Sequence, residues 1–350
     1  MDALLAGLML VTGGLGAPDV DPETRDWAAL DKQLERLAES VQEDRAPRLG
    51  LLMRGNYANS SDIQVGGNDL GGFLWDNLRV SVDGQAGAFE YRFQTESATV
   101  GVLGAVTTLD AWVRTPINTR VRLTMGLFGQ PFLNSSGTEP QNLLFILRTA
   151  SAQFWNSRDQ GVMLDGSVGA LDWAVAAANG TDAAGDDMAY SGQLTIQALG
   201  GGLDQVEGAY GKGDDLRATA VASMHVNENS AGDNNVMAFE LAGSFRRGYA
   251  ALEYLNYPDD GGAGTGVYSV ASDTAPLSAV LSFMFVEDKY EAAVRYQDLD
   301  DSFETSAITF GVNRYIEGRN LMWQLNYIDK SADAPAIDAQ TVAIGFTASL

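Results

Sequence analysis

From residue 48 to the end of the chain, apolar and polar side chains alternate in short stretches. The last stretch is the clearest: Val342, Ile344, Phe346, Ala348 and Leu350 share one face, and small or polar residues share the other. A period of two is typical of a β-strand with one apolar face. The same alternation recurs at 49–57, 89–96, 120–127, 237–245, 291–297 and 321–327.

Charged residues occupy the second face of most of these stretches, as Arg92, Arg122 and Arg295 do. In a transmembrane β-barrel the apolar face meets lipid and the polar face meets a water-filled lumen, so charges are tolerated there. Clusters rich in Gly, Asp and Asn separate the stretches and are typical of turns. The sequence therefore predicts an all-β fold: a transmembrane antiparallel β-barrel over residues 48–350, with about 16 strands and 18 as the alternative. We expect its last strand to pair with a first strand that begins near Leu49.

Aromatic residues recur near the ends of the predicted strands. Tyr and Trp side chains form girdles at the two interfaces of membrane barrels, where an apolar ring meets lipid and a polar tip meets water. We expect such girdle positions for Tyr57, Trp112, Trp173, Tyr190, Tyr249, Tyr257 and Tyr315.

The first 17 residues form an apolar stretch that ends in small residues near Ala17. The stretch is shorter than the about 20 residues that a transmembrane helix needs. It fits the apolar region of a signal peptide, although the basic residues that usually precede such a region are missing. A buried apolar helix is the alternative.

Residues 18–47 have a helical pattern instead of an alternating one. Asp21 can cap the helix, Pro22 suits its first position, and Pro47 ends it. An apolar stripe with spacings of three and four runs along this segment and consists of Trp27, Leu30, Leu34, Leu37 and Val41. We expect either a short periplasmic coiled coil between identical subunits or an ordinary amphipathic helix packed on a neighbour.

Composition narrows the functions that remain for such a barrel. The chain has 350 residues, no cysteine, one histidine and a formal net charge of −24. Without cysteine there is no thiol catalysis and no cysteine-based metal site. A negative net charge does not attract nucleic acid. We therefore expect no cofactor and no nucleic-acid partner.

The charges are distributed unevenly along the chain. Residues 48–160 carry 9 basic and 9 acidic side chains, and every basic one is an arginine. Residues 161–350 carry 9 basic and 27 acidic side chains. The first part of the predicted barrel is therefore neutral and rich in arginine, and the acidity lies downstream.

The single histidine bears on whether the chain is an enzyme. His225 alternates with Val221 and Ser223, which points all three side chains towards the predicted lumen. No recognisable nucleophile motif accompanies it, so we expect a structural role and no enzymatic activity. A barrel enzyme is a third hypothesis, and it predicts that His225→Ala abolishes a hydrolytic activity.

One long stretch, residues 131–158, interrupts the alternation. It contains Pro131, Pro140 and the apolar run Leu143–Leu147. Loops of this length inside a compact domain are usually functional. We expect this loop to fold into the barrel and narrow the lumen. Packing over the barrel mouth or against a neighbouring subunit is the alternative.

Residues 120–180 carry motifs of a known family. The segment 120–132 resembles the strand that enters the constriction loop of the phosphate-selective porins O and P. Segments 144–148, 157–162 and 171–173 follow in that family's order, and 290–296, 311–315 and 323–327 resemble its penultimate strands. The resemblance implies an outer-membrane porin of about 16 strands, usually trimeric, through which small hydrophilic solutes diffuse passively.

Selectivity in that family depends on a ladder of arginines and on lysine at the constriction. This chain has no lysine between residues 33 and 211, so we expect a general preference for anions without phosphate specificity. The guanidinium group suits phosphate and carboxylate, and fixed charges set pore selectivity. The predicted gate consists of Arg120, Arg122, Arg148 and Arg158, with Arg54, Arg79, Arg92 and Arg114 extending the ladder. The alternative is that these arginines pair with lumenal acids such as Glu90, Glu96 and Asp110 and brace the wall.

The leading hypothesis is a passive porin in the outer membrane of a Gram-negative-type bacterium, assembled as a homotrimer and surrounded by lipid. The alternative is a structural envelope protein, in which the barrel is an anchor and the N-terminal helix links the outer membrane to periplasmic partners. Deleting residues 18–46 separates the two hypotheses. Envelope detachment with unchanged permeability would favour the structural role.

Overall fold

The computed structural model describes residues 32, 46–65, 68–99, 102–154, 158–180, 188–227, 234–257, 274–301, 303–333 and 339–350. The chain divides into two compact units, Met1–Ala46 and Pro47–Leu350. The predicted signal peptide (1–17) and nearly all of the predicted helix (18–47) lie outside the described residues. The description below concerns the second unit.

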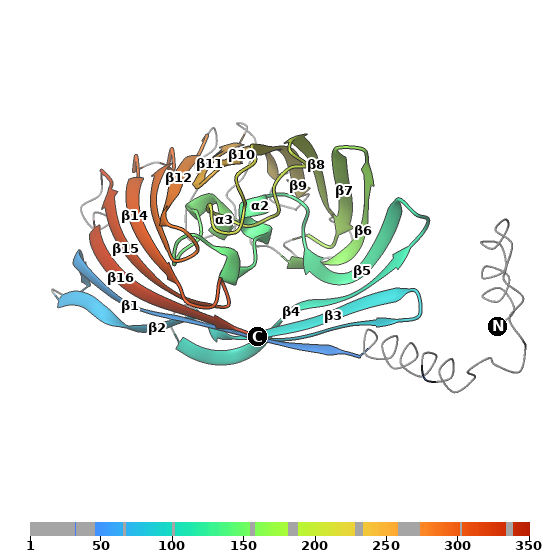
Figure 1. Ribbon diagram of the computed structural model, residues 1–350, viewed down its shortest axis with the longest axis horizontal. Coiled ribbons are helices and arrows are strands. Elements are labelled where there is room, and N and C mark those ends of the chain that lie inside the picture. The colour runs from blue at the N-terminus through green and yellow to red at the C-terminus, as the bar shows by residue number, and fades with distance from the viewer. Residues whose placement is uncertain are drawn as a thin grey trace, which may run out of the picture. The chain divides into compact units, whose positions relative to one another are not determined.

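Sixteen antiparallel strands form one closed barrel in which each strand pairs with its neighbours in the sequence (Figure 1). The strands are β1 (Arg48–Val65), β2 (Asn68–Ala86), β3 (Phe89–Thr99), β4 (Val102–Pro116), β5 (Val121–Gly129), β6 (Arg158–Val168), β7 (Leu171–Ala178), β8 (Ala189–Leu199), β9 (Arg217–Asn227), β10 (Asn234–Phe245), β11 (Gly248–Asn256), β12 (Leu277–Val286), β13 (Tyr290–Asp298), β14 (Ser306–Tyr315), β15 (Leu321–Ser331) and β16 (Ala339–Ser349). The predicted fold class and the lower of the two predicted strand numbers are therefore confirmed.

The first and last strands close the barrel, as the alternation near the end of the chain predicts. Tyr57 of β1 lies opposite Ile344 of β16, and Leu52 lies opposite Ser349. The backbone N–H of Leu350 also donates to the carbonyl of Leu51 at 2.9 Å. Closure leaves no unpaired sheet edge, so the strands satisfy one another's backbone groups all round the barrel.

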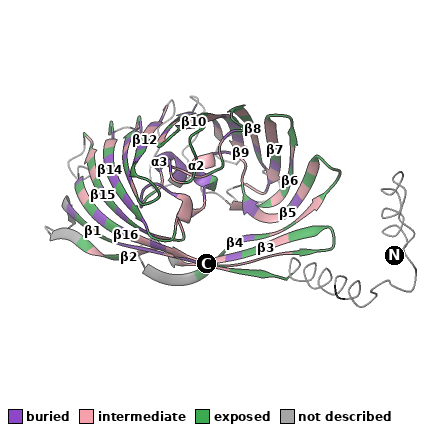
Figure 2. Cartoon of the chain, viewed as in Figure 1, coloured by how far each residue is buried: buried purple, intermediate pink, exposed green. Residues whose placement is uncertain are grey.

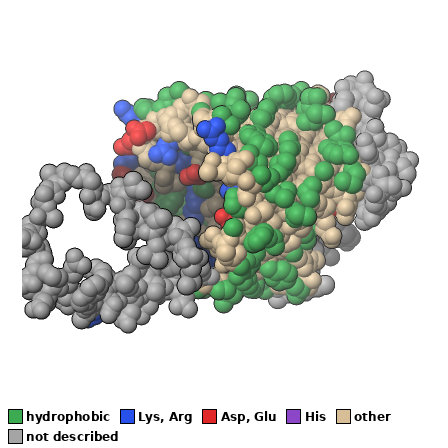
Figure 3. Space-filling model, turned by 90° about the vertical axis from the view of Figure 1, so that its right-hand side faces the viewer, with side chains coloured by type: hydrophobic (Ala, Val, Ile, Leu, Met, Phe, Trp, Pro, Cys, Tyr) green, Lys and Arg blue, Asp and Glu red, His purple; other side chains and the backbone are tan. Residues whose placement is uncertain are grey.

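Alternation along each strand separates a polar lumen from an apolar outer face. In β14, Thr309 and Asn313 point inward and are at most 1% exposed, whereas Phe310 on the outer face is 54% exposed. Buried and exposed positions alternate in the same way along most strands (Figure 2). On the side that Figure 3 shows, hydrophobic side chains are spread over the outer face of the barrel, and charged ones gather towards one end.

The predicted aromatic girdle holds for only some of its members. Tyr57 and Tyr190 are 40% and 46% exposed, as side chains on the outer face should be. Tyr249, Tyr257 and Tyr315 are at most 8% exposed, and the prediction is wrong for them. They occupy lumen-facing positions of the alternation, where inward-folded parts of the chain cover them.

Because the strands are antiparallel, successive connections alternate between the two ends of the barrel. The end that carries Leu350 is called the turn end. Six of its connections have two to five residues, namely 87–88, 117–120, 169–170, 246–247, 287–289 and 316–320. The seventh, residues 200–216, is much longer.

The constriction loop, defined here as residues 130–154, starts from the opposite end of the barrel. It contains α2 (Asn134–Gly137), the 3-10 helix η2 (Pro140–Asn142) and α3 (Ala150–Phe154). Figure 1 shows α2 and α3 inside the ring of strands. No described helix is long and apolar enough to cross a membrane.

Candidate pore constriction

The apolar run of the constriction loop packs against the inner face of β13–β16, called the latch wall. Phe145 and Ile146 are at most 2% exposed. Two glycines make room for them: a Cβ atom on Gly311 would lie 3.0 Å from the Phe145 ring, and one on Gly345 would lie 2.9 Å from Ile146. Larger residues at these two positions would therefore push the loop away from the wall.

Amide side chains of the latch wall bind the backbone of this apolar run. Asn313 Nδ2 donates to the carbonyl of Leu144 at 2.8 Å, and the N–H of Ile146 donates to Asn326 Oδ1 at 2.9 Å. Gln324 Nε2 also donates to the carbonyl of Leu144, at 3.1 Å. A loop inside a barrel has no ladder of its own, so these bonds satisfy backbone groups that burial would otherwise leave unpaired.

Two arginines complete the attachment. Arg54 of β1 is 3% exposed and donates through Nη2 to the carbonyl of Ile146 at 2.8 Å. Its other nitrogens donate to Thr347 Oγ1 and Asn77 Oδ1, both at 3.2 Å. Arg295 donates to the carbonyl of Leu147 at 2.8 Å. Arg54, predicted to extend the ladder of the pore, is therefore engaged by the loop.

Two carboxylates hold the helical parts of the loop. Glu240 of β10 and Glu253 of β11 lie directly opposite each other in the sheet. Glu240 accepts from the backbone N–H of Asn134 at 2.9 Å, and Glu253 accepts from the hydroxyls of Ser135 and Thr149. These hydrogen bonds attach the loop to β10 and β11.

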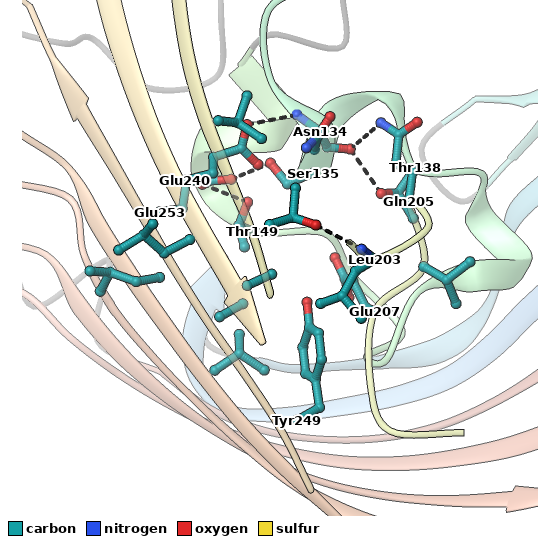
Figure 4. Close-up of a pocket in the computed structure, with 18 of the residues that line it drawn as sticks. Asn134, Ser135, Thr138, Thr149, Leu203, Gln205, Glu207, Glu240, Tyr249 and Glu253 are labelled. Atoms are coloured by element: carbon teal, nitrogen blue, oxygen red, sulfur yellow. Dashed lines mark hydrogen bonds between the residues drawn. The ribbon is translucent and has the colours of Figure 1, made fainter. Parts of the chain in front are cut away.

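A cavity of about 200 Å³ lies behind the loop at this point. Figure 4 shows it between α2, the strands that carry Glu240 and Glu253, and the segment that carries Leu203 and Glu207. The Tyr249 phenol points into it.

The opposite face of the lumen, β2–β6, is called the arginine wall because its inward side chains form a chain of ion pairs. Arg79 contacts Glu96 at 3.2 Å, and Arg158 contacts Asp110 at 2.9 Å. Arg92 approaches the same Asp110 at 3.5 Å. These contacts agree with the alternative that the lumenal acids brace the wall.

Asp165 of β6 joins two further members of the arginine wall. It pairs with Arg122 of β5 and lies 3.9 Å from Arg114 of β4. Glu90, the third acid proposed as a partner, lies opposite Arg114 in the register of β3 and β4. It makes no salt bridge within 4 Å among the described residues.

One carboxylate of the constriction loop reaches across to the arginine wall. Glu139 contacts Arg79 at 3.3 Å and Arg92 at 2.8 Å. The loop is therefore attached to both faces of the lumen, through hydrogen bonds on one side and through Glu139 on the other.

The four predicted gate arginines, and Arg92 and Arg114 of the predicted ladder, lie in different parts of this arrangement. Arg92, Arg114 and Arg122 lie on strands of the arginine wall, and Arg158 is the first residue of β6, not part of the loop as predicted. Arg120 was expected on a strand but lies exposed in the turn before β5, where its N–H donates to Asn118.

Arg148 is the only predicted gate residue within the described part of the constriction loop. It donates to the carbonyl of Ser135 at 2.7 Å, across the loop itself. Burial lowers the pKa of its guanidinium to about 10, and the nearby Glu207 carboxylate opposes this effect. The side chain therefore remains charged at neutral pH and helps to shape the loop.

Three polar cavities remain on the side of the arginine wall. One of about 260 Å³ is lined by Asp110, Gln130, Glu139, Arg158 and Gln193, among others. One of about 430 Å³ at the turn end is lined by Arg120, Arg122, Asp165, Asp172 and again Gln193. A third, also about 430 Å³, lies beside Arg48, Arg79, Arg92 and Glu139. Neighbouring cavities share the lining residue Gln193 or Glu139, so the three lie next to one another along the inner face of β1–β8.

The single histidine has a partner that the sequence did not suggest. His225 Nδ1 and the Ser191 hydroxyl lie 2.8 Å apart, and that hydroxyl also lies 3.2 Å from Gln130 Oε1. His225 is 4% exposed, and its ring lies 5.9 Å from that of Phe132. His225 and Ser191 therefore form a packing contact between strands β8 and β9 and the constriction loop.

The described residues contain no group of three or more His, Asp or Glu side chains with a geometry that could hold a metal ion.

No known sequence family matches the chain, and no curated protein matches it in sequence. Solved structures do match it. The anion-selective porin from Comamonas acidovorans has 12% identity and a TM-score of 0.59, over 87% of this chain and 99% of that one. The outer membrane channel DcaP of Acinetobacter baumannii has 12% identity and a TM-score of 0.59, over 87% and 97%.

OprB of Pseudomonas putida has 9% identity and a TM-score of 0.64, over 93% of this chain and 97% of that one. At such identities the likeness establishes the fold and nothing finer. This chain has the fold of bacterial outer-membrane porins.

Proposed function

We propose that this protein is a porin of the bacterial outer membrane through which small hydrophilic solutes diffuse passively. The observation that carries the proposal is the row of neighbouring cavities lined by charged and amide side chains along β1–β8, inside a closed barrel with an apolar outer face. A barrel built only as an anchor would not need an open polar lumen. The fold shared with known porins and channels adds support.

The solutes that we propose are small and hydrophilic, with at most a weak preference for anions. Arg79, Arg92, Arg114, Arg122 and Arg158 all have carboxylate partners, and such pairing reduces the field that a passing anion meets. Some arginine surface stays accessible: the Arg122 side chain is 50% exposed. The similar porin from Comamonas acidovorans is described as anion-selective, which makes the sign of selectivity worth measuring.

Membership of the phosphate-selective porin O and P family remains a prediction from the motifs in residues 120–180. Phosphate specificity is not part of our proposal. The described constriction loop carries no lysine. Its arginine, Arg148, donates a hydrogen bond to the backbone of the loop itself.

Single-channel recording in planar bilayers tests the main proposal. We expect discrete conductance steps from the purified protein, and a small reversal potential towards anions in a salt gradient. A correctly folded barrel that shows no conductance would contradict the proposal. A clear cation preference would contradict only the anion part, and would mean that the acidic residues beyond 160 dominate.

We further propose a homotrimer. The barrel has a wide apolar outer face, of which neighbouring subunits would cover part, as is usual for this class of fold. Chemical cross-linking in native membranes should give a ladder that ends at three subunits. A ladder that ends at one or two subunits would reject the trimer and leave the porin proposal intact.

A further inference from the structure

The connection between β8 and β9 differs from every other described connection at the turn end. Residues 200–216, called the inward turn segment, span 17 positions, whereas the others have two to five. Its backbone bends sharply at glycines with positive φ, a conformation that favours glycine. These are Gly200, Gly201, Gly202, Gly208, Gly211 and Gly213.

This segment turns back into the lumen. The N–H of Ala209 donates to Glu291 Oε1 on β13 at 2.6 Å. The Tyr210 ring stacks on that of Tyr315 at 4.2 Å between centroids. Lys212 is only 8% exposed and donates to the carbonyl of Val206 at 2.7 Å. The middle of the segment therefore packs on the inner face of β13 and β14.

Inside the barrel, the inward turn segment meets the constriction loop. Gln205 Nε2 donates to the carbonyl of Asn134 at 2.7 Å. The N–H of Glu207 donates to the carbonyl of Asn142 at 3.1 Å, and the N–H of Leu144 donates to Glu207 Oε2 at 2.9 Å. Bonds in both directions between the two segments make them one layer across the lumen.

Arg319, in the turn between β14 and β15, binds both segments at once. Its guanidinium donates to the carbonyl of Asn142 at 3.2 Å and to the carbonyl of Glu207 at 2.5 Å. One side chain of the turn end thus fixes the loop that enters from one opening and the segment that enters from the other.

Gln205 lies where this layer borders the open space. It is exposed and lines the cavity of about 260 Å³ together with Asp110 and Arg158. It also packs closely against the constriction loop, because a Cβ atom on Gly137 would lie 2.6 Å from its Nε2. A neutral amide at this position can donate to anions and accept from cations.

We propose that residues 200–216 form a second constriction element, which enters from the turn end, and that Gln205 lines the passage and helps to set which solutes pass. The inference rests on the proposed porin function. The sequence predicts a constricting role only for the apolar loop, and the proposal gives the same role to a connection at the turn end. Solutes would then have to pass the Gln205 amide where it lines the passage with Asp110 and Arg158.

Charged thiol reagents test whether Gln205 lines the passage. The chain has no cysteine, so Gln205→Cys and the matched control Asp215→Cys each carry a single thiol. Asp215 is exposed in the same segment but lines none of the three open cavities. A cationic methanethiosulfonate should cause a large stepwise fall in current at position 205 and little change at 215. A thiol at position 205 that the reagent does not label, or equal effects at both positions, would overturn the proposal.

Cross-linking tests the position of the segment without conductance. A short bis-methanethiosulfonate should join the two thiols of the double variant Gly137→Cys/Gln205→Cys, but should not join those of Gly137→Cys/Asp215→Cys. If the first pair fails to cross-link in the folded protein, the second constriction element is rejected. If the first pair cross-links but the unmodified protein does not conduct, the position of the segment is correct and the proposed porin function is wrong. The inferred role of the segment in permeation is then wrong as well.

Discussion

The two faces of the lumen, the latch wall and the arginine wall, use polar side chains in opposite ways. On the latch wall, Asn313, Gln324 and Asn326 are at most 1% exposed and bind the backbone of the constriction loop. On the arginine wall, Arg92 and Arg122 pair with carboxylates while 24% and 50% of their side-chain surface remains exposed. The latch wall binds the backbone of the loop, whereas the arginine wall meets the loop at Glu139 and otherwise faces the open space.

This difference indicates where stability and where selectivity reside. Leaving a buried hydrogen-bonding group without a partner costs about 1–3 kcal/mol, so each bond of the latch wall matters to the position of the loop. A solvent-exposed ion pair contributes about 0–1 kcal/mol, so charges at the exposed edge of the arginine wall, such as Arg122, can change with little effect on folding. The Arg79–Glu96 pair is largely buried, and breaking it would cost more. We expect changes on the latch wall to alter pore size, and changes on the arginine wall to alter ion preference.

The largest expected effect comes from filling the two glycine positions under the loop. Gly311→Leu with Gly345→Leu places side chains where Phe145 and Ile146 now pack, at an overpacking cost of about 1–3 kcal/mol per site. The loop should leave the latch wall, and single-channel conductance should rise severalfold. Gly192→Leu is the matched control, since its Cβ would meet only Val175 at 3.9 Å. Unchanged conductance would mean that the loop does not limit the pore.

Removing the buried arginine of β1 should have the next largest effect. Arg54→Met keeps a similar volume but leaves the carbonyl of Ile146 without this donor, at a cost of about 1–3 kcal/mol. We expect a lower temperature for the heat-dependent gel shift and a noisier open current. Arg48→Met, at the exposed start of the same strand, is the control and should change neither. Equal melting of the two variants would refute a special role for Arg54.

Neutralising the loop carboxylate on the arginine wall should change selectivity more than stability. Glu139→Gln removes the negative partner of Arg79 and Arg92 and keeps the side-chain size. The reversal potential in a salt gradient should shift towards anions, because rings of fixed charge set pore selectivity. Glu287→Gln changes the same charge in an exposed turn and should shift it less. A shift towards cations would contradict this account of the arginine wall.

The smallest expected effect is a pH dependence from Lys212. Burial, and then the neighbouring Arg319, lowers the pKa of its ammonium from 10.5 to about 8. Between these values the unfolded chain binds the proton and the folded chain does not, so the free energy of unfolding should rise with pH across this window. The temperature of the heat-dependent gel shift should follow it. In Lys212→Met this part of the rise should be missing, and a full rise in the variant would assign it to other groups.

Much of the fold could be predicted because it depends on local alternation. Period two alone predicts the strands around Arg92 and Arg122. The pairing of the last strand with the first follows because a barrel must close. Side-chain partners across the lumen could not be predicted in the same way. Glu240 and Glu253 bind residues of the loop more than a hundred positions away in the sequence. Glu139 of the loop binds Arg92 of the arginine wall. No local pattern in the sequence encodes such pairs.

The inward turn segment shows the same limit. Its sequence reads as a turn, since Gly211, Gly213 and two aspartates are typical turn residues. The length of the segment is the one feature of the sequence that indicates more than a turn. A connection of 17 residues is long beside the other turn-end connections, and such long loops are usually functional. Where it packs depends on Glu291, Tyr315 and Arg319, which lie some 80 to 110 positions downstream.

The register of the loop on the latch wall also bears on biogenesis. Gly311, Asn313, Gln324 and Gly345, which receive the apolar run, all come late in the chain, and Arg54 joins them only when β1 meets β16. Until then the loop lacks part of its binding surface. The lumen should therefore reach its final width only at the last step of barrel formation, when β1 pairs with β16.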